Sequence, residues 1–157
     1  MAHRFALAAS VVLLASLAGC AAIPADADGT IDRARGGELR VGVTANPPWV
    51  DLDGPGPAGS EVDLLEDFAD TLDADIEWMP GSEGVLVDAL RAGDIDIAIG
   101  GFTDDTPWAD DAAPTDVYTE VVNDRGVTEK HIMLTRAGEN RLLVELETFL
   151  REHGGAP

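Results

Sequence analysis

Short stretches of alternating hydrophobic and polar residues are separated along this chain by longer stretches with helical spacing. Alternation over residues 39–43 predicts a strand, which two consecutive prolines then end because proline cannot donate to a β-ladder. Over residues 60–72 the apolar positions recur every three or four residues, which predicts a helix with one buried face. Ser60 and Asp63 have the spacing of a capping box at its start.

The same patterns continue in the middle of the chain. Residues 76–79 predict a second strand and residues 94–99 a third, whose acids Asp94 and Asp96 are expected to face water or a helix terminus. A helix lies between these strands and ends at Gly93, a residue suited to a C-terminal cap. Its inward positions are Val85, Leu86, Ala89 and Leu90. Strands separated by helices of this length predict an α/β fold with a parallel sheet.

The C-terminal third is less regular. Residues 109–116 are rich in Asp, Ala and Pro and are expected to form a loop. Two strands are predicted over residues 117–122 and 130–135, with a turn at 123–129 between them. Residues 139–153 have the amphipathic pattern of a final helix.

The N-terminus has the layout of a secretory leader. A basic start at His3 and Arg4 precedes an apolar run over residues 5–17, which is too short to span a bilayer comfortably. The tetrad Leu-Ala-Gly-Cys at 17–20 resembles the lipobox of bacterial lipoproteins, and this resemblance implies a lipid anchor on Cys20. An ordinary signal peptide with an incidental cysteine, or a buried first helix, remains the alternative. Because Cys20 is the only cysteine, no intramolecular disulfide can form.

These patterns divide the chain into a leader over residues 1–19, a flexible tether over 20–37, one α/β domain over 38–153 and a tail over 154–157. The tether is rich in Ala, Asp and Gly and shows no apolar periodicity. Removal of the leader leaves roughly 137 residues, which is the usual size of one domain.

The chain is strongly acidic, with a formal net charge of −20. Lys130 is its only lysine, and arginines supply the other basic residues of the ten. Nucleic acid and anionic membrane surfaces are therefore excluded as expected partners, whereas cationic or neutral ligands are favoured. A simpler interpretation, in which the charge only keeps the protein soluble, stays open.

Three runs of sequence together resemble one protein family. They are GELRVGVTANPPWVDLDG, GSEVDLLEDFADTL and VDALRAGDIDIAIGGFTDDTPWADDAAPTDVYTE. In their order and spacing they are similar to the first lobe of the family 3 extracellular solute-binding proteins, the periplasmic components of importers for polar amino acids and related solutes. The resemblance covers residues 37–120, and residues 129–153 resemble the returning strand and last helix of that lobe. It implies a single lobe of a periplasmic-binding-protein-like (type II) fold.

The resemblance also implies where a ligand is held. Such proteins close two lobes over the ligand, which contacts loops at the carboxyl ends of the strands. The residues that match by position are Trp49, Glu61, Phe102 and Thr103, with Trp108 in the same loop as the last two. The four residues matched by position also have a purely structural interpretation: Trp49 and Phe102 as core caps, Glu61 as a complement to the helix dipole and Thr103 as a turn residue.

This sequence departs from the family in two respects. Amino-acid binders usually carry an arginine near position 108 that grips the ligand's carboxylate, but no arginine lies between Arg91 and Arg125. Nearby acids would repel a carboxylate further; they are Asp104, Asp105, Asp110 and Asp111. The second lobe is also missing, since only a short segment separates Tyr118 from Lys130. An ordinary α-amino acid is therefore a poor candidate ligand, and half a cleft binds weakly unless another chain, such as a second copy, completes it.

The sequence offers no residue arrangement typical of an enzyme active site. The three histidines, His3, His131 and His153, form neither a metal-ligand pair nor part of a serine–histidine–acid arrangement. His131 is interpreted as a surface or core-edge residue. The acids of DDTPWADD lack the EF-hand spacing, so a solvated loop is favoured over a calcium site. We expect no enzymatic activity, no cofactor and no metal.

The function expected is that of a lipid-anchored, extracytoplasmic solute-binding protein, a component of an ABC-type importer of small polar or cationic solutes. Its expected partners are the solute, a permease, the membrane through Cys20 and, if two lobes rebuild a cleft, a second copy. The alternative is an envelope interaction module derived from such a lobe that has lost ligand binding. An exposed apolar patch of Trp49, Phe102 and Trp108 would favour that alternative.

Overall fold

A computed structural model describes residues 25–154 of the chain, so the predicted leader and Cys20 lie outside the described residues. The elements are α2 (Thr30–Ala34), β1 (Glu38–Val43), α3 (Ser60–Leu72), β2 (Asp75–Pro80), α4 (Glu83–Ala92), β3 (Ile97–Ile99), β4 (Ala113–Pro114), β5 (Thr119–Val122), β6 (Thr128–His131), β7 (Leu134–Thr135) and α5 (Asn140–His153). They follow the expected order of strands and helices, except that α2 forms in the predicted tether and the two-residue strand β4 forms in the segment expected to be a loop over residues 109–116.

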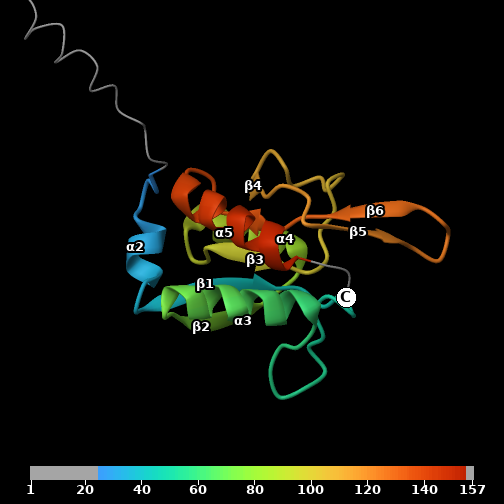
Figure 1. Ribbon diagram of the computed structural model, residues 1–157, viewed down its shortest axis with the longest axis horizontal. Coiled ribbons are helices and arrows are strands. Elements are labelled where there is room, and N and C mark those ends of the chain that lie inside the picture. Colours follow the sequence, from blue (N-terminus) through green and yellow to red (C-terminus); the bar gives the residue numbers. More distant parts are fainter. Residues whose placement is uncertain (1–24, 155–157) are drawn as a thin grey trace, which may run out of the picture.

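Five strands form the main sheet, in the order β2-β1-β3-β7-β4. β1 runs parallel to β2 and to β3, as the sequence predicts, whereas β7 is antiparallel to both of its neighbours. The sheet is therefore mixed, because the chain returns to it through β7 after leaving the parallel part. β5 and β6 form a separate two-stranded sheet, an antiparallel hairpin that projects from the body of the domain (Figure 1).

Helices cover both faces of this sheet (Figure 1). One hydrophobic cluster joins α2, α3 and α5 to the sheet, and a second joins α4 to the opposite face. The alternation in β3 explains this division, since Ile97 and Ile99 enter the first cluster while Ala98 enters the second. Burial on both faces is typical of strands in α/β proteins.

The predicted tether is wrong from Asp26 onward. Residues 30–34 form α2, in which Ile31 is fully buried against the main core. The Asp26 carboxylate accepts hydrogen bonds from the N–H groups of Ile31 and Leu142, both at 2.9 Å. Glu139 in turn accepts from the N–H groups of Asp28 (2.9 Å) and Thr30 (3.1 Å). Sequence periodicity cannot reveal this segment, because its helix is five residues long and its partners lie more than 100 residues away.

Asp96 is also not at a solvated edge, contrary to the prediction. Its side chain is fully buried, and its carboxylate pairs with the guanidinium groups of Arg33 and Arg40 at 2.6 Å each. Burial alone would raise the pKa of Asp96, but the hydrogen bonds from Arg40 and Arg33 outweigh burial and hold that pKa below its ordinary value. Asp94, by contrast, is exposed as expected.

Three local predictions need correction. Val85 is 50% exposed rather than inward, because the apolar face of α4 is narrower than its composition suggests. The segment predicted as one strand over 130–135 divides into the end of β6 and the separate strand β7. Ser60 does not cap α3: Gly59 is the N-cap, and the carbonyls of Pro48 and Trp49 accept the first N–H groups of the helix instead.

Candidate functional site

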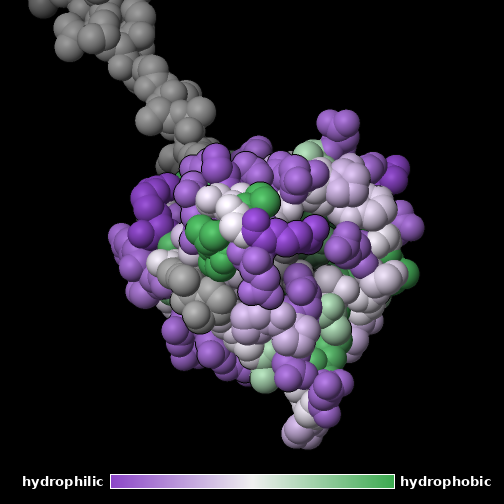
Figure 2. Space-filling model, turned by 90° about the vertical axis from the view of Figure 1, so that its right-hand side faces the viewer, coloured by the Kyte–Doolittle hydropathy of each residue, from purple (hydrophilic) through white to green (hydrophobic). Residues whose placement is uncertain are grey.

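The strand order creates a topological switch point at the carboxyl ends of β1 and β3. The first crossover runs from β1 through α3 to β2, and the next runs from β2 through α4 to β3 on the other side of β1, so the strand order reverses at β1. Such a switch point is where open α/β sheets bind ligands. The loop after β1 carries Trp49, and the loop after β3 carries residues 100–103. Figure 2 views this end of the molecule, where hydrophilic residues predominate and apolar residues show in small patches.

Glu61 connects three segments at this switch point. It lies in the first turn of α3 and is fully buried. One carboxylate oxygen accepts hydrogen bonds from the N–H groups of Gly100 (2.7 Å) and Gly101 (2.9 Å), and the other accepts from the Tyr118 hydroxyl (2.6 Å). Both oxygens are thus used inside the protein, so Glu61 positions the loop after β3 and the start of the hairpin.

The environment of Glu61 shifts two pKa values in the same direction. Burial raises the pKa of the Glu61 carboxyl, against the lowering effect of its hydrogen bonds from Tyr118 and the two glycine N–H groups. Burial, together with the adjacent Glu61 carboxylate, also raises the pKa of Tyr118, whose hydroxyl therefore stays protonated and donates. Within residues 25–154 no Lys, Arg or His forms an ion pair with Glu61.

Trp49 lies at the centre of an aromatic group in front of Glu61. The His131 ring covers it, with ring centroids 3.9 Å apart and planes inclined by 33°. Tyr118 meets Trp49 edge-on, at a centroid distance of 6.4 Å and an interplanar angle of 89°. Only 6% of Trp49 remains exposed. Trp49, the aromatic residue predicted to contact ligand, is therefore covered by the side chains of Tyr118 and His131.

The backbone beside Trp49 requires glycine. Gly101 has a φ of 68°, in the left-handed region that disfavours residues with a Cβ. A Cβ built at this position would lie 2.5 Å from Trp49 Cδ1 and 2.6 Å from Asn46 Nδ2. Asn46 donates a hydrogen bond from its side-chain amide to the Gly100 carbonyl at 2.9 Å, which ties the two loops together. The indole and the loop after β3 are thus in direct contact.

The other three predicted site residues lie in different surroundings. The Phe102 side chain is buried in the α4 cluster, while its carbonyl accepts from Ile132 N–H at 2.9 Å. The Thr103 hydroxyl is half-buried and donates to Asp105 at 2.6 Å, and its backbone bridges to His131. Trp108 packs toward α4 and donates from Nε1 to Glu83 at 2.9 Å. The structure therefore brings Trp49, Glu61 and the backbone of 100–103 together, with Trp108 on the α4 side.

Tyr118 and His131 belong to this group, and sequence reasoning did not place either of them in the site. Both lie where the chain leaves and re-enters the domain through the hairpin, and they meet Trp49 only through the fold. No local motif marks either residue. The interpretation of His131 as a core-edge residue agrees with its burial but does not indicate its stacking partner.

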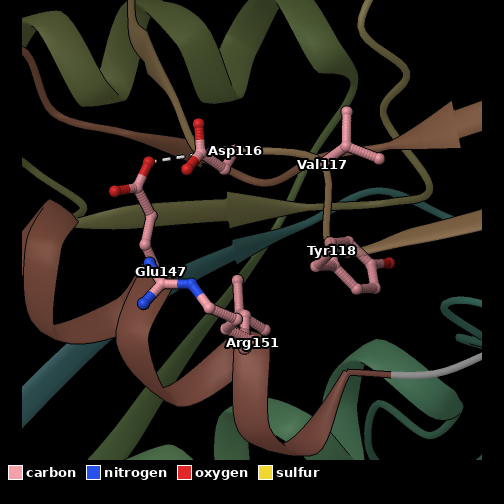
Figure 3. Close-up of a pocket in the computed structure, with 6 residues that line it drawn as sticks. Asp116, Val117, Tyr118, Glu147 and Arg151 are labelled. Atoms are coloured by element: carbon pink, nitrogen blue, oxygen red, sulfur yellow. Dashed lines mark hydrogen bonds between the residues drawn. The ribbon is translucent and has the colours of Figure 1, made fainter.

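A separate cavity of about 200 Å³ lies between the start of β5 and the C-terminal half of α5 (Figure 3). Its lining residues are Asp116, Val117, Tyr118, Glu147, Leu150 and Arg151. The Asp116 N–H group donates to Glu147 at 2.8 Å across its rim. Within residues 25–154, no cluster of three or more His, Cys, Asp or Glu side chains is arranged to hold a metal ion. In the same range no helix combines the length and apolar character needed to cross a membrane.

Comparisons with known proteins agree with this arrangement. The family model of the bacterial extracellular solute-binding proteins, family 3, matches residues 39–153. Domain 1 of TmArgBP, solved as the arginine-bound form of its Phe57Trp mutant, is 28% identical, with a TM-score of 0.68 over 78% of this chain and 96% of that one. The same domain without that mutation, also arginine-bound, is 27% identical, with a TM-score of 0.67 over 77% and 97%.

A more distant structure has the same fold. An ancestral cationic amino acid solute-binding protein, AncCDT-1, is 17% identical, with a TM-score of 0.65 over 80% of this chain and 92% of that one. No curated protein matches the sequence. The family model spans most of the folded domain, and the domain matches one lobe of a periplasmic binding protein. This chain therefore belongs to the bacterial extracellular solute-binding proteins, family 3, and its described residues match one lobe of such a protein.

Proposed function

We propose that this domain binds a small cationic solute at Trp49, at the carboxyl ends of β1 and β3. The observation that carries the proposal is an aromatic ring at the switch point of the sheet, surrounded by loops that carry acids and no arginine. Aromatic faces attract cations through the ring quadrupole, and nearby carboxylates add to that attraction.

The acids lie on the segments that contact Trp49 and its neighbours. Asp104 donates its backbone N–H to the Lys130 carbonyl at 2.9 Å, beside His131 in β6. Asp105 accepts from the Thr103 hydroxyl, and Glu129 lies 4.0 Å from the His131 ring. Any solute that reaches the indole therefore meets negative charge, which favours an ammonium or guanidinium group over a carboxylate.

The likeness to domain 1 of TmArgBP supports a binding role for one lobe alone. That domain was solved in an arginine-bound form without its second lobe, and this chain covers 96% of it. In the present sequence no arginine stands between Arg91 and Arg125 to pair with a ligand carboxylate. We therefore assign recognition to the cationic end of the solute, with no catalytic step.

The domain is further proposed to act outside the cytoplasm as the receptor of an ABC-type importer, anchored by lipid on Cys20. Five residues separate Cys20 from Asp26, the first residue bound to α5, and the six steps between their Cα atoms reach about 20 Å when fully extended. The anchor would therefore hold the folded domain close to the membrane surface. Of the three aromatic residues whose exposure would favour the interaction module, Trp49 is 6% exposed, Phe102 is 4% exposed and Trp108 is half-buried, which supports solute binding over that alternative.

Isothermal titration calorimetry with three solutes tests the binding proposal. Agmatine has a guanidinium and an ammonium group without a carboxylate, L-arginine adds the carboxylate, and L-glutamate is net negative. We expect agmatine to bind at least as tightly as arginine and glutamate not to bind. Because half a cleft buries little of a solute, a dissociation constant on the order of 0.1–1 mM is expected. Equal heats for all three solutes, or none for the two cations, would refute the proposal.

A further inference from the structure

The His131 ring occupies the place at Trp49 that the proposed solute would need. The two rings stack at 3.9 Å, and only 2% of His131 and 6% of Trp49 are exposed. Tyr118 meets the same indole edge-on, and Gly101 lies against its Cδ1 atom. No solute can therefore lie on the indole in this conformation unless the imidazole moves.

No side-chain hydrogen bond from the described residues holds the His131 ring in this position, although the backbones of Gly101 and Phe102 lie near enough to favour its protonated form and so oppose the effect of burial on its pKa. Neither Nδ1 nor Nε2 has a hydrogen-bond partner among residues 25–154, although both atoms are buried. A buried polar atom without a partner costs free energy that contact with water or another partner would recover. Burial also lowers the pKa of His131, so the stacked imidazole is neutral. In the stacked position the faces of the two rings are in contact, but the ring nitrogens of His131 lack hydrogen-bond partners.

A partner for the displaced ring lies on the same strand. Glu129 precedes His131 by two residues in β6, so both side chains leave the same face of the strand. Glu129 Oε2 is 4.0 Å from Nε2, and the Glu129 side chain is 41% exposed. A small outward rotation of the imidazole would bring it to this carboxylate and to water.

Other charged groups around His131 belong to three further segments. Asp104 and Asp105 lie on the loop after β3, whose Thr103 bridges to His131. On β5, Glu120 pairs in register with Lys130, the residue before His131. From α3, Glu61 reaches this group only through Tyr118. Acids therefore predominate, and they favour the protonated imidazole once it leaves its buried position.

We propose that His131 controls access of the cationic solute to Trp49: the neutral imidazole covers the indole, and the solute binds when the ring turns out toward Glu129. This inference rests on the proposed function, because it concerns the same site. His131 thereby influences which solutes bind, because a solute must replace the stacking contact between the imidazole and Trp49 with a flat contact of its own. Planar cations such as guanidinium meet that requirement better than tetrahedral ammonium ions.

The proposal fixes the direction of a pH effect. The stacked ring has a lowered pKa, whereas a ring turned out beside Glu129 and water does not carry that desolvation penalty. Protonation therefore favours the open position, and solute affinity rises as the pH falls from 7.5 to 5.5. Agmatine keeps both charges over this range, so the solute itself does not titrate.

Calorimetric titration of the full chain with agmatine at pH 7.5 and 5.5 tests this mechanism, using the wild type, His131→Ala and His131→Phe. At pH 7.5, His131→Ala should bind roughly three- to tenfold more tightly than the wild type, the range expected for one aromatic contact. At pH 5.5 the wild type should approach His131→Ala. His131→Phe retains a covering ring that cannot be protonated, so its affinity for agmatine should be the same at pH 7.5 and pH 5.5.

Two results would overturn the proposal, and they differ in what else they reject. Equal affinity of the wild type and both variants at the two pH values would reject the gate and leave solute binding intact. Absence of agmatine binding in all three proteins would reject the proposed function and the gate with it. If His131→Ala fails to fold, the comparison of the wild type with His131→Phe still decides the question through its pH dependence.

Discussion

Glu61 is the side chain whose replacement tests the architecture of the site most sharply. Its carboxylate accepts hydrogen bonds from Gly100, Gly101 and Tyr118, which belong to two segments that surround Trp49. Glu61→Ala removes all three acceptor contacts at once. Glu61→Gln retains one carbonyl oxygen for the two glycine N–H groups, and its amide can donate to the Tyr118 oxygen instead.

The expected loss of unfolding free energy follows from the hydrogen-bond donors that Glu61→Ala leaves without an acceptor. A buried donor that loses its acceptor costs about 1–3 kcal/mol, and of the three donors only Gly100 N–H is fully out of reach of water. Removal of a buried, unpaired carboxylate returns part of that cost. We therefore expect Glu61→Ala to lose about 3 kcal/mol of unfolding free energy and Glu61→Gln to stay within about 1 kcal/mol of the wild type. For a domain of this size, 3 kcal/mol lowers Tm by roughly 10 °C.

The sign of the pH effect provides a second test of the same pair. Because the folded-state pKa of Glu61 is raised, its contribution to stability is greatest below the ordinary glutamate pKa. That contribution is lost as the pH rises through the raised folded value. Glu61→Gln has no such proton, so its stability should fall less than that of the wild type between pH 4.5 and 8.

Urea unfolding of the wild type and both variants, followed by circular dichroism at several pH values, measures these quantities. If the unfolding free energy of Glu61→Ala lies within 1 kcal/mol of that of Glu61→Gln, the conclusion that this carboxylate holds the two segments in place is refuted. A parallel pH dependence in the wild type and Glu61→Gln would refute the raised pKa.

Three further predictions concern other parts of the domain. Asp96→Asn should lower the free energy of unfolding by about 3 kcal/mol at pH 7 and make the stability less sensitive to acid. The reason is that the lowered pKa of Asp96 gives stability that is lost as the pH falls through its folded value. Acid titration monitored by circular dichroism checks this, and an unchanged acid midpoint would contradict it. Ile31→Ala should cost about 2–4 kcal/mol in urea unfolding if α2 is part of the folded core, whereas a loose tether predicts no change. Gly101→Ala should alter the near-ultraviolet signal of Trp49 and lower Tm, since its Cβ would lie 2.5 Å from the indole; an unchanged spectrum and melting curve would count against that contact.

The helices and parallel strands of the first two thirds were predictable because their apolar residues repeat with a clear period. β1, α3 and α4 lie where alternation and helical spacing place them, and Gly93 ends α4 in the left-handed conformation expected of a C-cap. The switch point then placed Trp49 at the candidate site. Short elements were missed, because a five-residue helix such as α2 carries no periodic signal.

The polar interior was harder to predict. The pattern of Asp94, Ile95 and Asp96 suggests a solvated edge, but two arginines from other segments pair with Asp96 and allow its burial. In the same way, nothing local in the sequence joins His131 to Trp49 or Tyr118 to Glu61. Such contacts depend on how distant segments meet, and sequence periodicity reports only on neighbouring positions.

The most direct test of solute binding at Trp49 is a titration of the ¹⁵N-labelled protein with agmatine, followed through the indole N–H resonances. The chain has three tryptophans, and Trp78 in β2 and Trp108 beside α4 serve as internal controls. The account predicts a saturable shift of the Trp49 resonance, with the other two resonances unchanged. No shift at any agmatine concentration, or a shift confined to Trp78 or Trp108, would contradict it.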